Sequence, residues 1–373
     1  MILRASPSGD HDPGAARIPS LDGWRAVAIL LVLGSHCIYA SGFPKSMEGT
    51  MLWLFDGNLG VRVFFVLSGY LISLLLIREA HRVGNLSLER FYIRRAFRIL
   101  PIYYAYLALL AGLSVFGLYR DKASTWIGCL TFTRNMMGRG DSSTGHFWSL
   151  AVEEQFYVIW PVVLKLFHLW KRPLTYFFVL LIPLVFCPII RYGFVSSEFG
   201  GSIATRILGD HSILVYADSL AVGCLGAWFT DRTSQRWEWR GWHSFAFLAS
   251  LALIILTHSV QLAYPGQIVS ALVPAVQAWA VITCVILSVH ERSTGYRILN
   301  SRAMVTIGVL SYSLYVWHFL FLGRFSGPTL SIWPTHDWRV WLFPSVALSV
   351  LSYRFLEKPF MGLRRRFQNN RVP

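Results

Sequence analysis

Two ionisable side chains interrupt an apolar segment near the start of the sequence. Arg25 and His36 both lie in LDGWRAVAILLVLGSHC, residues 21–37, and are eleven positions apart. On an α-helix this spacing is three turns plus about 20°, so both lie on one face, about 16 Å apart along the axis. A guanidinium there can bind an anion and an imidazole can act as a base, although Arg25 is also placed to snorkel. The pair suits an elongated ligand with an anionic head and a reactive end.

Other apolar segments also carry ionisable groups, namely Glu153 and Glu154, Asp218, and His318. At 1.5 Å per residue, they and His36 fall about 18–22 Å from one membrane face. Ionisable groups at that depth are costly and therefore candidates for function. Taken singly, Asp218 and His318 fit a helix-to-helix hydrogen bond equally well. Glu153 and Glu154 point about 100° apart, so only one of them can face His36 squarely.

The composition indicates which elements position these groups. Of 373 residues, 54% are hydrophobic and 14% are charged, whereas soluble domains carry roughly 25% charged residues. Since a membrane-spanning helix needs about 20 apolar residues, we predict an all-α integral membrane protein, a bundle of about ten transmembrane helices. The expected spans are 21–40, 59–77, 99–118, 146–168, 174–193, 210–229, 243–262, 267–289, 303–325 and 335–357.

The basic residues set the expected orientation. Lys and Arg gather in alternate connections, above all in 78–98, which by the positive-inside rule places those connections and both termini in the cytosol. The net charge of +15 is thereby explained without a nucleic-acid partner. The five scattered cysteines predict neither a metal site nor disulfides. We expect a polar tail at 1–17, one transmembrane domain at 18–360, and a basic cytosolic tail at 361–373.

Several motifs are similar to those of a known family. The chain resembles the acyltransferase-3 family of bacterial membrane acyltransferases, which modify sugars and other cell-envelope molecules. One departure is Arg62, where the family more often has an uncharged or acidic residue. The motifs are LDGWRAVAILLVLGSH, FFVLSGYLIS at 64–73, FYIRRAFRILPIYY at 91–104, HFWSLAVEEQFYVIWP at 146–161, SYSLYVWH at 311–318 and FLEKPF at 355–360.

The resemblance implies a reaction and its partners. A cytosolic acyl-CoA, with acetyl-CoA favoured and larger groups open, would donate its acyl group to a hydroxyl, often on a saccharide or lipid-linked saccharide. Acyl-CoA is then a donor substrate, and no tightly bound cofactor is expected. The protein would be a multi-pass protein of the bacterial inner membrane, with the lipid bilayer as its surroundings.

Candidate roles follow from that reaction. His36 would be the general base on the acceptor hydroxyl, or would itself carry the acyl group. Glu153 or Glu154 would orient His36 or neutralise its imidazolium. The phosphates of the donor would bind Arg25, Arg94, Arg95 and Arg98. The candidates for oxyanion or substrate contacts are Ser68, Tyr315, His318 and Asp218.

A secondary transporter is the alternative class. Intramembrane His, Glu and Asp would then form a proton or substrate relay. Transporters often contain paired repeats with broken helices, and no such repeat is visible in the sequence. Acyl-CoA-dependent labelling of an acceptor separates the two classes.

Overall fold

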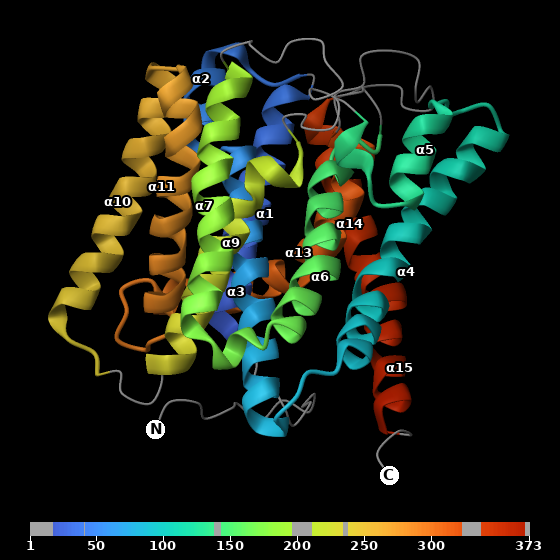
Figure 1. The fold of residues 1–373 in the computed structure, drawn as a ribbon. Helices are drawn as coiled ribbons and strands as arrows, with labels where there is room; N and C mark the ends of the chain where they lie inside the picture. Colours follow the sequence, from blue (N-terminus) through green and yellow to red (C-terminus); the bar gives the residue numbers. More distant parts are fainter. Residues whose placement is uncertain are drawn as a thin grey trace.

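Each predicted apolar segment folds into an α-helix, because a helix satisfies the backbone polar groups that lipid cannot (Figure 1). The computed structural model describes residues 18–40, 42–137, 143–195, 211–233, 238–322 and 337–369. No β-strand occurs in these ranges, which confirms the predicted fold class. The helices are α1 (Pro19–Tyr39), α2 (Lys45–Leu54), α3 (Gly57–Val83), α4 (Leu88–Val115), α5 (Ala123–Leu130), α6 (Phe147–Leu166), α7 (Pro173–Val195), α9 (Ile213–Thr233), α10 (Gly241–Ala263), α11 (Gln267–Ser288), α12 (Tyr296–Leu299), α13 (Arg302–Leu322), α14 (Trp338–Ser352) and α15 (Lys358–Asn369).

Eight stretches of helix in the described residues are long and apolar enough to cross a membrane. Two of the ten predicted spans correspond to the remaining long helices, α6 and α14. Helix α6 carries three polar residues in a row, Glu153–Gln155, which lower its mean hydropathy. Helix α14 has only 15 residues before a π-helical turn at Tyr353–Glu357. The protein is a multi-pass α-helical membrane protein.

The basic connection predicted at 78–98 is wrong in extent. Helix α3 continues to Val83, and Gly84 ends it with a left-handed φ of 77°, which glycine adopts without strain. Helix α4 begins at Leu88, where the Ser87 side chain accepts a hydrogen bond from the Arg90 backbone N–H. Only residues 84–87 connect the two helices. Arg94, Arg95 and Arg98 therefore lie on helix α4 and not in a loop.

The long helices alternate in direction, so the connections fall at two ends of the bundle (Figure 1). One end holds the connections α3–α4, α6–α7 and α11–α13, the end of α9 and the start of α10, together with the start of α1 and the end of α15. These are the connections in which the sequence gathers its Lys and Arg. We call this end the basic end. That it faces the cytosol stays a prediction.

Glycines allow the helices around the site to approach closely. A Cβ atom at Gly308 of α13 would overlap the Asp22 carbonyl of α1, and one at Gly69 of α3 would overlap the Leu220 carbonyl of α9. Small residues at such crossings are how membrane helices gain packing contacts without a hydrophobic driving force. The α1–α13 contact determines which residues of α13 face Arg25 and His36.

The connection between α4 and α6 folds back onto the bundle at the end opposite the basic end. The Gln155 amide of α6 donates to the Phe132 carbonyl at 3.0 Å and to Asn135 Oδ1 at 2.9 Å. Tyr106 of α4 donates to the Ser143 carbonyl at 2.6 Å. These bonds hold the start of α6, and with it His146.

Candidate functional site

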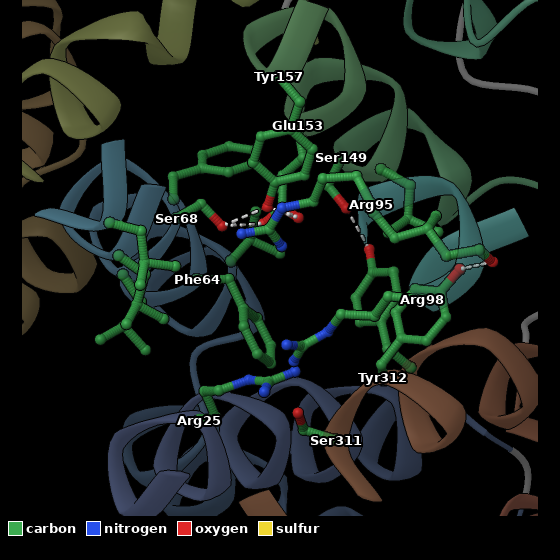
Figure 2. Close-up of a pocket in the computed structure, with 18 residues that line it drawn as sticks. Arg25, Phe64, Ser68, Arg95, Arg98, Ser149, Glu153, Tyr157, Ser311 and Tyr312 are labelled. Atoms are coloured by element: carbon green, nitrogen blue, oxygen red, sulfur yellow. Dashed lines mark hydrogen bonds between the residues drawn. The ribbon is translucent and has the colours of Figure 1, made fainter. Parts of the chain in front are cut away.

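Five helices line one pocket in the bundle: α1, α3, α4, α6 and α13 (Figure 2). The cavity encloses about 160 Å³. Its lining on α3 runs from Val61 to Leu75, which is about 21 Å of helix at 1.5 Å per residue. The pocket is thus elongated along the bundle axis. Its end at Leu75 lies nearest the basic end, because α3 reaches that end at Val83.

Three arginines enter the pocket from two helices, Arg25 from α1 and Arg95 and Arg98 from α4 (Figure 2). Among the described residues, none of their guanidinium groups donates a hydrogen bond. Arg95 lies over the Tyr157 ring at 4.9 Å, and Arg25 is 3.9 Å from Asp22. Several unused N–H donors therefore point into one cavity, the arrangement that binds phosphate or carboxylate.

Arg94, the fourth arginine predicted to bind the phosphates of acyl-CoA, does not face the pocket. Its Nη2 donates to Glu79 Oε2 at 3.0 Å, and it is absent from the pocket lining. A spacing of one residue rotates a helical side chain by about 100°, which explains why Arg94 and Arg95 differ.

The Glu153 carboxylate lies in the pocket and has defined partners. Ser68 donates to Oε1 at 3.0 Å and Tyr157 donates to Oε2 at 3.0 Å, while the two hydroxyl oxygens are 2.9 Å apart. Glu154 does not line the cavity. The partners of Glu153 are thus Ser68 and Tyr157 rather than His36, so a carboxylate acting on His36 stays a prediction.

Tyr315 of α13 lines the pocket on the side of the histidines His146 and His318. The Tyr315 hydroxyl donates to the His146 carbonyl at 2.8 Å and contacts the Ser149 hydroxyl. The Tyr315 ring lies 5.5 Å from both the His146 and the His318 ring. Tyr315 therefore separates the cavity from a group of histidines.

His36 belongs to that group of histidines. Its Nδ1 donates to the Val32 carbonyl at 2.9 Å, and its ring meets His318 edge to face at 4.9 Å. The structure thus brings together two residues to which the sequence assigned the same depth. His146, which precedes α6, joins them with its ring 5.3 Å from His318. The sequence argument did not single out His146, although it is the first residue of the HFWSLAVEEQ motif.

Asp218 does not join the other candidates. It is fully buried on α9, and Arg191 of α7 donates to it at 2.7 Å. Arg62, the departure from the family pattern, is also buried and donates to the Gln277 side chain of α11. Neither Asp218 nor Arg62 lines the cavity. Both belong to interhelical contacts.

One carboxylate beside the pocket was missed. Glu357 is 3% exposed, accepts a hydrogen bond from Ser313 at 3.0 Å, and lies close enough to Arg98 and Arg25 for their charges to attract it. It belongs to the π-helical turn after α14, a local geometry found often at functional sites. The sequence signal that could have identified Glu357 is its position in the FLEKPF motif.

Comparison with known families identifies the family. A family described as an acyltransferase domain, acyltransferase-3, matches residues 18–354. The chain belongs to this family. Five of the six motifs that carry the resemblance contribute residues to the pocket lining, and the sixth supplies Glu357. The family motifs thus surround one cavity.

Curated relatives in this family cover most of the chain. The peptidoglycan O-acetyltransferase OatA of Listeria monocytogenes is 29% identical over 374 residues, which are 92% of this chain and 55% of the relative. The O-acetyltransferase OatA of Staphylococcus aureus is 28% identical, covering 92% and 57%. The putative peptidoglycan O-acetyltransferase YrhL of Bacillus subtilis is 29% identical, covering 92% and 54%. The chain spans about half the length of these relatives. No solved structure matches it.

Proposed function

We propose that this protein is a membrane O-acyltransferase that moves an acetyl group from cytosolic acetyl-CoA to a hydroxyl of a cell-envelope saccharide. The observation that carries the proposal is the set of three guanidinium groups with unused donors in one elongated cavity. Arg25 and Arg98 approach one another across the cavity (Figure 2). Like charges held this close favour an anion between them, and the phosphates of coenzyme A supply it.

The length of the pocket supports a donor of this shape. The phosphates would bind near the basic end, and the pantetheine arm would extend along α3 toward Tyr315. The apolar lining residues Phe64 and Leu71 suit the arm, which carries little charge. The thioester would then reach the part of the bundle that contains His36.

His36 is the proposed general base. Its Nδ1–H is bound to the Val32 carbonyl, and a carbonyl only accepts, so Nε2 carries the free lone pair. Nε2 would take the proton from the acceptor hydroxyl while the hydroxyl oxygen bonds to the thioester carbon. The C–S bond then breaks, and coenzyme A leaves as a thiolate that is finally protonated. Tyr315 and Ser68 line the cavity, but each already donates its one O–H, to the His146 carbonyl and to Glu153, so an oxyanion role for either stays a prediction.

The relatives support the acceptor class and the location. Two of them are described as acting on peptidoglycan, which is a saccharide polymer outside the bacterial inner membrane. We therefore propose a cell-wall or exported saccharide as acceptor and the inner membrane as the location. Family membership favours transfer over the secondary transporter that the sequence also allowed.

Sealed membrane vesicles of opposite orientation test the proposal. Acetyl-CoA does not cross a bilayer, so labelled acetyl-CoA should label the vesicle glycan only in inside-out vesicles, where the cytosolic face is accessible. Substituting His36→Ala should lower the labelling rate about 10²–10⁴-fold, the usual contribution of a general base. Mass spectrometry of the glycan should show the addition of acetyl groups.

His81→Ala is the matched control, because His81 lies near the basic end beside Asp231 and outside the pocket lining. It should label at the wild-type rate at equal protein level. Labelling in right-side-out vesicles only, or an unchanged rate in His36→Ala, would contradict the proposal.

A further inference from the structure

Three histidine rings form a cluster between α1, the start of α6 and α13. His318 is fully buried and His146 is 4% exposed. The His318 ring lies 4.9 Å from His36 and 5.3 Å from His146, both edge to face. Phe319 packs against all three rings. The cluster is therefore closely packed, and two of its three rings are buried on the far side of Tyr315 from the pocket.

Each ring has its single neutral N–H bound to a backbone carbonyl. The His36 Nδ1 donates to Val32, and the His318 Nδ1 donates to Tyr315 at 2.7 Å. His146 uses the other nitrogen, since its Nε2 donates to Val316 at 3.1 Å. A carbonyl accepts only, so these bonds fix the tautomer of each neutral ring.

The remaining ring nitrogens are then bare lone pairs. His318 Nε2 and His146 Nδ1 are buried without a hydrogen-bond partner among the described residues. Buried polar atoms are nearly always hydrogen-bonded, so two unpaired acceptors beside a proposed base call for an explanation. Each of these two nitrogens could accept a proton or a hydrogen bond. The proposed reaction at His36 removes a proton from the acceptor hydroxyl.

A carboxylate normally stabilises the imidazolium formed by a histidine base. In the described part of the chain, no hydrogen bond or ion pair joins a carboxylate to any of the three rings. A second imidazole is thus the group available to share the proton.

We propose that His318 shares the proton that His36 takes from the acceptor hydroxyl, as an N–H···N bond between the two Nε2 atoms, with His146 holding the His318 ring in place. This rests on the proposed acetyl transfer. The hydroxyl O–H bond breaks, the oxygen bonds to the acyl carbon, and the C–S bond breaks. The shared proton finally passes to the thiolate, so both rings return to neutral. His318 acts through His36 and is a positioning residue for the transferred proton.

His318→Asn tests this role. The asparagine amide can still donate to the Tyr315 carbonyl but has no lone pair basic enough to hold a proton. With labelled acetyl-CoA as donor and muramidase-released peptidoglycan fragments as acceptor, we expect kcat to fall about tenfold or more, within the range of acid–base effects. The KM for acetyl-CoA should stay at the wild-type value. Rates in H₂O–D₂O mixtures should fit two moving protons in the wild type and one in His318→Asn.

An unchanged proton inventory in an active His318→Asn protein would overturn the inference while leaving the acetyl transfer intact. Failure of the proposed function is a different result, since the wild type would then transfer no acetyl group. If His318→Asn does not fold, ¹⁵N spectra of histidine-labelled wild-type protein in lipid decide the question. Nδ1–H tautomers at both His36 and His318 support the inference, and an Nε2–H tautomer at His318 overturns it.

Discussion

Arg191 and the three pocket arginines of this bundle differ in how their N–H donors are used. Arg191 makes four hydrogen bonds, to Asp218 and to the carbonyls of Val215 and Ala271. Arg25, Arg95 and Arg98 line the cavity, and their guanidinium groups donate no hydrogen bond to the described residues. A buried guanidinium that donates from each of its nitrogens to protein acceptors has a structural role, whereas one whose N–H groups face a cavity is available to a ligand.

The same contrast separates the two polar regions of the proposed site. The pocket near the basic end is lined by ionisable groups of both kinds, among them Arg98 and Glu153. The histidine cluster beyond Tyr315 contains three imidazole rings, each bound to a backbone carbonyl. The first region suits binding of an anion and the second suits handling of a proton. Under the proposed function, the bundle thus divides donor recognition and proton transfer between these two regions.

Breaking the ion pair should have the largest effect on folding. Asp218→Leu leaves Arg191 buried without its counter-charge, which costs about 3–5 kcal/mol. We expect little folded protein in the membrane, measured by size-exclusion chromatography after mild detergent extraction. The double variant Arg191→Met with Asp218→Leu removes both charges and should recover folded protein and acetyl transfer. A folded, inactive double variant would instead place the pair in the reaction.

A matched pair on α4 tests the other side of the comparison. Arg95→Gln removes a guanidinium that faces the cavity, and Arg94→Gln removes its neighbour, which is bonded to Glu79. A charge-assisted hydrogen bond contributes about 1.5–3 kcal/mol, so Arg95→Gln should raise the KM for acetyl-CoA about tenfold or more. The KM of Arg94→Gln should stay within about twofold of wild type. Equal KM values for the two variants would contradict the donor site.

The sequence predicted the helices and one part of the site, for a physical reason. Apolar length and helical rise give the depth of a residue, which was enough to bring His36 and His318 to one level. Depth does not give the neighbouring helix. Asp218 has nearly the same depth but packs with Arg191, because the packing of helices, including close glycine crossings such as Gly69 against α9, decides which elements meet.

Two further residues show what sequence patterns miss. His146 is the first residue of the predicted span 146–168, and a position at the end of a span gives no sign of which helices the side chain meets. Glu357 lies in a π-helical turn, which shifts the residues that follow relative to a regular helix. The contacts of both residues with α13 depend on how α6 and the end of α14 pack against that helix, which the sequence alone does not give.

The smallest effect is expected at Ser68, and it separates two roles for a pocket hydroxyl. Ser68 has one O–H, which is donated to Glu153, and Glu153 keeps a second bond from Tyr157. Ser68→Ala should therefore lower kcat by less than about tenfold, since Tyr157 still holds Glu153 and the Ser68 O–H is not free to donate to the reacting atoms. A free oxyanion donor would cost about 10²–10³ in kcat. Single-turnover rates with labelled acetyl-CoA measure the difference, and a loss of that size would make Ser68 an oxyanion donor whose bond to Glu153 is exchanged during the reaction.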